Sequence, residues 1–524
     1  MTAVAHQSDN IEINDAFASA LELMERGEHH LFITGRAGTG KSTLLAYFRA
    51  NTARNVVVVA PTGVAALNVQ GQTIHRFFQF SINVTPEKIT SKEIRPRETK
   101  VYQKLDTLLI DEASMLRADL LDCIDAFLRL YGPETGTSFG GVRLVFIGDL
   151  YQLPPVVTKE EREIFRDFYE SPYFFSAGAL ADNPPYIVEL EKIYRQRDPD
   201  FVEVLNRIRN NAVGDADIAY LNQRHFPDFE PDNTNFYITL AATNKHADTI
   251  NAERLAALEG ATHVATAEIT GDFGREYYPT APELEYKIGA QIMLLNNDTK
   301  GRWVNGSIGA IEESLRDERD REYLAVRLQE SDDLVSVYPY TWEVYRFSLK
   351  DGAVASEPVG SFRQYPLRLA WAVTIHKSQG MTFDNVIIDL TGGRTFASGQ
   401  MYVALSRCTT LEGLVLKSPI RKSDIRADYR IHNFLIAREK NSAEADNPLE
   451  ARIALIEQAI ANENRVEMTY LKADNTKQNR LVRPISIVEE HYKGSSFTGM
   501  RAFCLLRKDF RVFNVERILD VREK

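Results

Sequence analysis

The chain has 524 residues, of which 44% are hydrophobic and 26% charged, so it is long and apolar enough to bury more than one core. No apolar run approaches the length of a membrane span, and no basic-plus-apolar leader pattern is visible, so we expect a cytoplasmic protein. Three widely spaced cysteines form neither a zinc pattern nor a disulfide framework, which suits a reducing compartment. A formal net charge of −11 excludes a generally basic nucleic-acid binder, so any nucleic-acid path has to be a local groove.

The first motif is a glycine-rich loop between an apolar, β-prone run at 30–34 and a helical pattern from Thr43. Its glycines let backbone N–H groups converge on phosphate oxygens, at the positive end of the helix dipole. Lys41 can reach the β- and γ-phosphates, and the Ser42 hydroxyl can ligate Mg²⁺. The motif therefore predicts a nucleoside triphosphate site, with an inert glycine turn as the alternative. The residues predicted to hold the nucleotide here are Gly35, Arg36, Ala37, Gly38, Thr39, Gly40, Lys41, Ser42 and Thr43.

Two acids follow a buried-strand pattern at 108–110, where a parallel strand emerges from its sheet. Asp111 is predicted to hold Mg²⁺ through water, and Glu112 to orient and deprotonate the attacking water. The pair favours hydrolysis over mere binding, although Asp-Glu also occurs as an ordinary strand end. A third strand at 142–147 leads to Gln152, a candidate γ-phosphate sensor, and then to a Pro-Pro pair that alone indicates only a strand terminator.

The second half repeats this strand–loop–helix order. Strand patterns occur at 236–242, 366–373 and 386–390, and helical patterns at 243–258 and 399–407. Arg407 closes the last helix. The order predicts a second α/β unit that presents an arginine to a cleft shared with the first, as in a clamp operated by ATP.

Seven motifs together carry a family resemblance over roughly residues 30–415. They are, in order, GRAGTGKS, APTGVAALNVQGQTIHRFF, LLIDEASM, FGGVRLVFIGDLYQLPPV, KIYRQ, AVTIHKSQGMTFDNV and MYVALSRC. This set resembles superfamily-1B DNA helicases of the petite-integration-frequency (Pif) type, relatives of the RecD-like helicases. The resemblance implies ATP and Mg²⁺ as cofactors, single-stranded and forked DNA as partners, a monomeric chain, and 5′→3′ unwinding in repair, recombination or telomere maintenance.

The resemblance also implies residue roles. Arg195 and Arg407 would stabilise charge on the transferred phosphoryl group, and Gln152 would couple the γ-phosphate to the DNA path. Gly380 would border the nucleotide. The residues implied to line the single-strand channel are Pro61, Thr62, Gly63, His75, Phe77, Thr374, His376 and Lys377. Arg195 has the alternative of a surface helix residue, and Phe77 that of a core residue.

One departure from the family pattern lies upstream of the P-loop. The family usually has an adenine-reading glutamine there, whereas residues 11–17 contain none and offer Asn14 as a substitute. Adenine preference is therefore left open.

The predicted fold is α/β, with two RecA-like P-loop domains, a small SH3-like β-barrel insertion and a C-terminal WYL-like domain with an Sm-like barrel. Alternating strand patterns and the Asn305-Gly306 hairpin signal indicate the insertion. A helical pattern at 449–461 followed by short alternating strands indicates the C-terminal domain. Its arginines Arg483, Arg501, Arg507 and Arg511 indicate an anion or nucleic-acid pocket or, alternatively, a solvated basic face. The expected parts are 1–190 with a wedge-like insertion or, alternatively, a solvated loop at about 79–101, 191–285 with 361–437, the insertion 286–360, a polar linker 438–448 and the WYL-like domain 449–524.

These observations predict an ATP-dependent 5′→3′ DNA helicase. One alternative is a RecD-like recombination or conjugation subunit. The other is a DNA-binding regulator with a WYL domain, switched by ATP; the predicted roles of Glu112 and Arg407 in hydrolysis argue against it.

Overall fold

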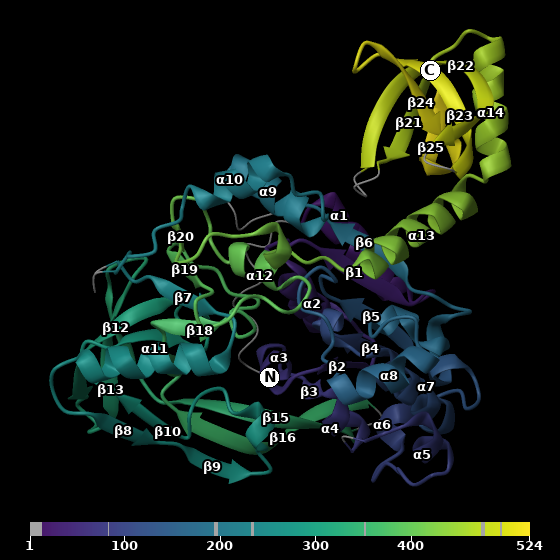
Figure 1. The fold of residues 1–524 in the computed structure, drawn as a ribbon. Coiled ribbons are helices and arrows are strands. Elements are labelled where there is room, and N and C mark those ends of the chain that lie inside the picture. Colours follow the sequence, from purple (N-terminus) through teal and green to yellow (C-terminus); the bar gives the residue numbers. More distant parts are fainter. Residues whose placement is uncertain are drawn as a thin grey trace. The chain divides into compact units, whose positions relative to one another are not determined.

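The computed structural model describes residues 13–81, 83–192, 198–231, 235–350, 353–472, 477–492 and 495–524. The chain forms two compact units, one of residues 1–209 with 213–426 and one of 210–212 with 427–524 (Figure 1). Among the described residues, no helix combines the length and apolar character that a membrane crossing requires.

A six-stranded parallel sheet forms the first lobe of the larger unit, with strand order β3-β2-β4-β5-β1-β6. Its strands are β1 (Leu31–Gly35), β2 (Val56–Ala60), β3 (Gln72–Thr73), β4 (Thr107–Ile110), β5 (Arg143–Ile147) and β6 (Tyr186–Leu190). Its helices include α1 (Asp15–Arg26), α2 (Lys41–Asn51), α3 (Gly63–Asn68), α4 (Ile74–Phe78), α7 (Ala118–Tyr131) and α8 (Lys159–Phe168). Central strands such as β5 are buried throughout, which explains their uninterrupted apolar runs. The strands predicted around the P-loop and the paired acids are confirmed.

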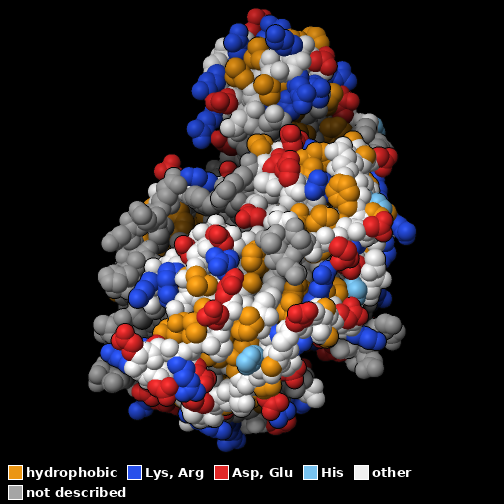
Figure 2. All heavy atoms as spheres, turned by 90° about the vertical axis from the view of Figure 1, so that its left-hand side faces the viewer, with side chains coloured by type: hydrophobic (Ala, Val, Ile, Leu, Met, Phe, Trp, Pro, Cys, Tyr) orange, Lys and Arg blue, Asp and Glu red, His pale blue; other side chains and the backbone are white. Residues whose placement is uncertain are grey.

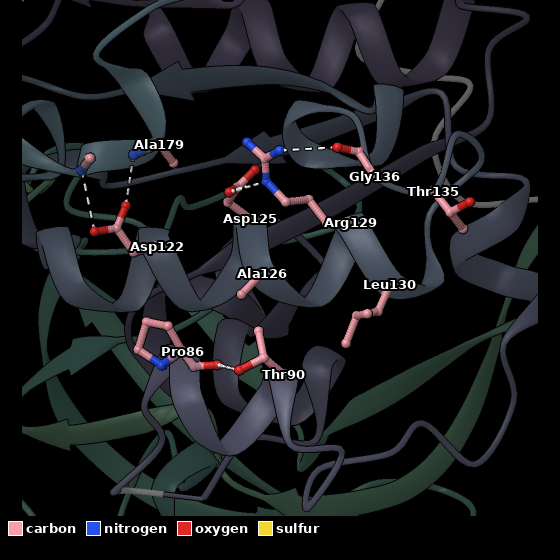
Figure 3. A pocket seen from close by; sticks show the side chains of 11 residues that line it. Pro86, Thr90, Asp122, Asp125, Ala126, Arg129, Leu130, Thr135, Gly136 and Ala179 are labelled. Atoms are coloured by element: carbon pink, nitrogen blue, oxygen red, sulfur yellow. Dashed lines mark hydrogen bonds and ion pairs between the residues drawn. The ribbon is translucent and has the colours of Figure 1, made fainter.

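Two short helices, α5 (Pro86–Thr90) and α6 (Lys100–Gln103), occupy the region predicted as a wedge-like insertion. The Thr85 side chain accepts a hydrogen bond from the Lys88 amide and caps α5, and Ile89 is fully buried. A surface groove of about 720 Å³ lies between α5 and α7 (Figure 3). Its charges are paired, because Arg129 bonds Asp125 and the Asp122 carboxylate accepts from the amides of Gly178 and Ala179. The segment is therefore more than a solvated loop.

The second lobe is a smaller parallel sheet with the order β18-β7-β19-β20. Its strands are β7 (Ile238–Ala241), β18 (Ala372–Thr374), β19 (Val386–Asp389) and β20 (Leu414–Leu416). Its helices are α9 (Pro199–Arg209), α10 (Asp215–Asn222), α11 (Asn244–Ala257) and α12 (Gln400–Leu405). The second α/β unit that the sequence predicts is thus confirmed, and β18 and α12 carry the motifs around Thr374 and Arg407. The run predicted as one strand at 366–373 is divided, because only β18 belongs to this sheet and residues 367–369 pair in an antiparallel sheet.

Antiparallel strands interrupt this lobe between α11 and β18. They form a five-stranded sheet, β14-β13-β12-β11-β17, a three-stranded sheet, β15-β16-β9, and the pair β8–β10. Their bounds are β8 (His263–Thr266), β9 (Glu268–Gly271), β10 (Glu283–Tyr286), β11 (Gln291–Leu294), β12 (Ile308–Arg316), β13 (Glu322–Leu328), β14 (Leu334–Val337), β15 (Tyr340–Lys350), β16 (Ala353–Gln364) and β17 (Leu367–Leu369). The alternation predicted for 286–360 is confirmed as strands, but the β-rich region extends beyond both ends of that range.

The Asn305-Gly306 pair forms a turn without a two-residue hairpin. Gly306 has φ +100°, and the Ser307 amide donates to the Val304 carbonyl at 3.0 Å. This turn closes only the last part of a long connection from β11 to β12, so the hairpin prediction is wrong in that respect. The Asn305 side chain instead reaches Asn68 of α3 at 3.4 Å.

The smaller unit contains two helices and a five-stranded antiparallel sheet, β24-β23-β22-β21-β25. Its elements are α13 (Tyr429–Asp446), α14 (Leu449–Ala461), β21 (Val466–Leu471), β22 (Lys477–Tyr492), β23 (Ser495–Cys504), β24 (Asp509–Asn514) and β25 (Ile518–Glu523). Ile456 and Ala459 of α14 pack on the sheet core around Val466 and Met500. The predicted helix at 449–461 is confirmed. The polar run at 438–448 differs from the irregular linker expected, because α13 continues through most of it.

Candidate active site

The glycine-rich loop joins β1 to α2 in a shape that requires glycine at several positions. Gly38 and Gly40 have φ of +80° and +85°, in the left-handed region that favours glycine. A Cβ on Gly35 would lie 2.6 Å from the Leu190 carbonyl oxygen and 2.7 Å from Thr39 Oγ1. The loop therefore forms a backbone cradle at the N-terminus of α2, which fits the phosphates predicted there.

Lys41 is the first residue of α2 and turns back over the loop. Its Nζ donates to the carbonyl oxygens of Gly35 at 2.7 Å and Arg36 at 2.9 Å. Ser42 and Thr43 follow it and are exposed at the start of the helix. The ammonium group thus already lies at the mouth of the cradle, where phosphate oxygens would be its ligands.

Asp111 and Glu112 follow β4, at the same edge of the sheet as the loop after β1. Burial raises the pKa of both carboxyl groups; their mutual repulsion adds to this for Glu112, whereas the nearby Lys41 lowers both pKa values. Glu112 lies in the left-handed region with φ +50°, an unusual conformation for a side-chain-bearing residue. Its Oε2 accepts a hydrogen bond from Nε2 of Gln379 in the second lobe, at 2.8 Å.

Gln152 belongs to a buried polar cluster at the end of β5, the strand between β4 and β1 in the sheet. Its Nε2 lies 3.4 Å from Asp149 Oδ2, and the same carboxylate meets Arg209 of α9 at 3.6 Å and the Tyr402 hydroxyl of α12 at 3.5 Å. Burial raises the pKa of Tyr402, and the nearby backbone amide of Ala37 in the P-loop lowers it. The segment after β5 thus links the P-loop lobe to two helices of the second lobe.

Arg407 is fully buried just after α12. Its Nη1 donates to the carbonyl oxygens of Met381 at 2.9 Å and Ser378 at 3.3 Å, and its Nε donates to Val403 at 2.9 Å. Burial raises the pKa of Glu112, and Lys41 and Arg407 lower it. Arg407 also binds the carbonyl of Ser378, the neighbour of Gln379, whose amide reaches Glu112. The predicted arginine is therefore close to the nucleotide loop while holding the turn that contains Gly380.

Among the first-lobe residues predicted to line a strand channel, two have structural roles. The Phe77 ring is 5% exposed and packs against Phe78, Tyr102 and Phe347 at centroid distances of 4.8–5.8 Å. It is therefore a core residue and has no free face for a base, so that prediction is wrong. A Cβ on Gly63 would lie 2.1 Å from the Glu276 carbonyl oxygen, so this glycine is required for backbone packing.

The other predicted first-lobe residues lie at helix starts. Thr62 caps α3 by accepting from the Ala65 amide at 3.3 Å, and Pro61 precedes it and is half-buried. His75 lies on α4, half-buried, and burial lowers its pKa. These three remain candidates for contact with a strand.

In the second lobe, Thr374 ends β18 and its hydroxyl accepts from the Lys377 amide at 3.3 Å. Lys377 is exposed, and the half-buried His376 ring stacks on Phe396 with 6.3 Å between centroids and 21° between planes. Phe396 is 60% exposed. The sequence reasoning missed this phenylalanine, whose only signal was an aromatic residue in a glycine-rich loop.

Two other predicted positions have different outcomes. Arg195 lies outside the described residues. Asn14 caps α1, where its Oδ1 accepts from the Phe17 amide at 2.9 Å, so its side chain has a local structural role.

The larger unit has two lobes, each built on a parallel sheet. One lobe holds a phosphate cradle with paired acids, and the other holds a buried arginine. This arrangement defines a two-lobed P-loop nucleoside triphosphatase. Residues 10–216 match the family model described as "PIF1-like helicase", residues 354–444 a model described as "Helicase", and residues 451–523 the model of the WYL domain. The chain belongs to the PIF1-like helicase family.

Relatives and solved structures agree with this assignment. The chain is 32% identical to the ATP-dependent DNA helicase Pif1 of Psychrobacter sp. over 76% of this chain and 67% of the relative, and 31% identical to that of Bdellovibrio bacteriovorus over 78% and 88%. The structure of Bacteroides sp. Pif1 in complex with ADP-AlF4 matches with 37% identity and a TM-score of 0.76, covering 82% of this chain and 97% of that one. Bacteroides Pif1 bound to single-stranded DNA matches with 36% identity and a TM-score of 0.58, again over 82% and 97%.

Proposed function

We propose that this chain is an ATP-dependent DNA helicase that moves 5′→3′ along single-stranded DNA and unwinds duplex ahead of it. The observation that carries the proposal is the bond between Glu112 in the P-loop lobe and Gln379 in the second lobe. It joins the carboxylate suited to hydrolysis to the segment suited to holding a strand. The Bacteroides relative solved with ADP-AlF4 and with single-stranded DNA supports both ligands for this chain.

The nucleotide chemistry follows from the first lobe. The amides of the P-loop and Lys41 would bind the phosphates. The Ser42 hydroxyl, and Asp111 through water, would hold Mg²⁺, an ion that prefers oxygen ligands and keeps several waters. When bound, Mg²⁺ neutralises charge on the β- and γ-phosphate oxygens. Glu112 accepts a proton from the attacking water, and Arg407 and Arg195 stabilise charge on the transferred group.

The strand contacts lie mainly in the second lobe. Lys377 is exposed to meet phosphates, and the paired rings of His376 and Phe396 offer a face to a base. Thr62 and His75 contribute from the first lobe. Closure of the lobes on ATP and reopening after hydrolysis then move one lobe along the strand. Opening a base-pair step costs on average about 1.4 kcal/mol, well within the range of one ATP per step.

The accessory parts fit the same activity. The α5 region would act as a wedge at the fork. The β-rich insertion would cover the DNA strand, as an SH3-like barrel does in this family. The WYL domain would contact DNA or a partner through its exposed arginines. These roles derive from the family resemblance and from the position of each part in the chain.

The test is ATP hydrolysis by the full chain with and without single-stranded DNA. We expect strong stimulation by DNA in the wild type. Glu112→Gln should lose about 10²–10⁴-fold in turnover while still binding ATP, because an amide cannot accept the water's proton. Lys41→Ala should weaken both binding and turnover. Wild-type turnover in the Glu112→Gln variant would show that the assignment of the base is wrong.

A further inference from the structure

Gln379 is a side chain that none of the sequence motifs above assigned to a role. It lies in the second lobe, five residues after the end of β18, yet its amide nitrogen reaches Glu112 of the first lobe at 2.8 Å. A neutral amide that donates to a carboxylate both stabilises its charge and fixes its direction. The orientation of Glu112 thus depends on the position of a residue in the other lobe.

The segment that carries Gln379 is a compact set of turns. The Ser378 amide donates to Thr374 at 3.0 Å, the Gln379 amide to His376 at 3.3 Å and the Met381 amide to Ser378 at 3.0 Å. The Ser378 hydroxyl is fully buried and donates to the Ile375 carbonyl at 2.8 Å. Because these bonds join residues 374–381 into one rigid piece, a displacement at His376 or Lys377 moves Gln379 with it.

The same piece holds the buried arginine. Arg407 donates to the carbonyl oxygens of Ser378 and Met381, the residues on either side of Gln379 and Gly380. One turn therefore determines the position of two groups suited to hydrolysis: Glu112 through a side chain and Arg407 through two carbonyls.

Glu112 is unusually dependent on such support. Its backbone lies in the left-handed region with φ +50° and ψ 43°, a conformation that persists only where the surroundings hold it. The hydrogen bond from Gln379 is a direct side-chain restraint of this kind.

We propose that Gln379 is a positioning residue that transmits strand binding on segment 374–377 to the carboxylate of Glu112, so that DNA stimulates hydrolysis through this hydrogen bond. The inference rests on the proposed function and extends it by naming the link between the two ligands. Gln379 sets the geometry of the base and has no part in binding ATP or DNA.

The test compares Gln379→Met, which keeps the length of the side chain but removes the donor, with Gln379→Glu, which places a second negative charge against Glu112. ATP turnover and KM are measured with and without an oligothymidylate, together with oligothymidylate affinity and Tm. Gln223→Met, which alters an exposed glutamine after α10, is the matched control.

We expect Gln379→Met to lower DNA-stimulated kcat by about 10- to 100-fold, the range of one hydrogen bond to a charged group, with KM, DNA affinity and Tm unchanged. Gln379→Glu should lower DNA-stimulated kcat further, and Gln223→Met should have the wild-type kcat. Wild-type stimulation in Gln379→Met, or an equal loss with and without DNA, would overturn the coupling role alone. A wild-type chain that gains nothing from DNA would overturn the proposed function as well.

Discussion

Arg407 combines two demands on one side chain. Its guanidinium supplies donors to the carbonyls of Ser378, Met381 and Val403 while lying close enough to Glu112 to lower its pKa. Removing the whole side chain would leave buried carbonyls without donors and a cavity behind them. A test of its role in catalysis therefore has to separate charge from support.

We predict that Arg407→Lys lowers DNA-stimulated kcat by about 10³-fold or more, because a lysine cannot reproduce the fork that an arginine finger presents. ATP affinity should remain near the wild-type value. Arg407→Ala should lose the same activity and also lower Tm. Turnover, nucleotide affinity and thermal unfolding are measured for both variants. Normal turnover in the lysine variant would show that the guanidinium fork of Arg407 is not needed for catalysis.

Phe396 is the second residue whose position suggests a role. Its ring is 60% exposed and stacked on His376, a residue implied to line the strand channel. Stacking of a base on an aromatic ring contributes about 1–3 kcal/mol. We therefore predict that Phe396→Ala weakens single-strand affinity by about 5- to 100-fold without lowering Tm, and that Phe396→Tyr does not. Fluorescence anisotropy with a labelled oligonucleotide measures the effect, and equal affinities would exclude Phe396 from the strand path.

The sequence predicts residues well where chemistry fixes both type and spacing. Lys41, Ser42 and Asp111 follow from a motif whose geometry leaves little freedom, and all three lie at the edge where they were expected. The role of Gln379 could not be predicted, and the sequence left open whether Phe77 lies in the core or on the strand path, because each depends on which side chains of distant segments lie nearby. The sequence motif is the same whether its phenylalanine faces DNA or packs against Tyr102.

At the scale of elements, the start of β1 depends on a buried histidine. His30 is 6% exposed, its Nδ1 accepts from the Leu144 amide of β5 at 3.1 Å, and its ring meets Phe139 edge-on at 5.1 Å. Burial, with smaller contributions from Arg143 and His29, lowers its pKa from 6.5 to about 4. The folded chain therefore keeps this ring neutral over a range in which the unfolded chain takes up a proton.

The sign of the pH effect follows from this difference. The contribution of the neutral His30 to the free energy of unfolding is fully present above pH 6.5 and is lost as the pH falls towards 4. The loss between pH 7 and pH 5 is about 2 kcal/mol. We predict that His30→Gln, which keeps an acceptor but does not titrate, loses less unfolding free energy than the wild type over that interval. Denaturant unfolding at both pH values measures it, and parallel losses would contradict a neutral buried His30.

Helices and strands could be predicted where hydrophobic residues recur with a clear helical period or form an uninterrupted apolar run. The helix α14 matches its predicted range, and β4 begins one residue before the range predicted for it, because burial on one or both faces determines their composition. The polar run at 438–448 was misread, since Glu, Lys and Ala are also good helix formers and the run continues the pattern of α13. The limits of the β-rich insertion were missed because β8 pairs with β10 across a long intervening segment, so no local pattern marks the two strands as partners.

At the scale of the whole molecule, acidic and basic side chains are intermixed on the surface. The net charge of −11 spreads over a surface on which acidic and basic side chains alternate, as Figure 2 shows for one face. On the C-terminal unit, Lys and Arg lie beside hydrophobic side chains in the same view. Its four predicted arginines are all exposed, and Arg501 is paired with Glu490 at 2.7 Å. Their exposure favours the solvated alternative over an anion pocket.

The WYL domain is an addition to the helicase lobes that the sequence located correctly from its helix-then-strands order. Its fold is complete in itself, with α14 packed on a five-stranded sheet and a core of its own. The two helicase lobes, in contrast, share contacts such as Gln379 with Glu112 and Arg209 with Asp149. The nucleotide chemistry therefore belongs to the larger unit.

Strand displacement tests the central claim most directly. The full chain is given ATP, Mg²⁺ and a short duplex with a single-stranded tail on either the 5′ or the 3′ side, with Glu112→Gln as the inactive control. We predict that the wild type separates the 5′-tailed duplex and leaves the 3′-tailed duplex intact, and that the Glu112→Gln chain separates neither. Unwinding from the 3′ tail, or DNA-stimulated hydrolysis with no displacement of either strand, would contradict the account.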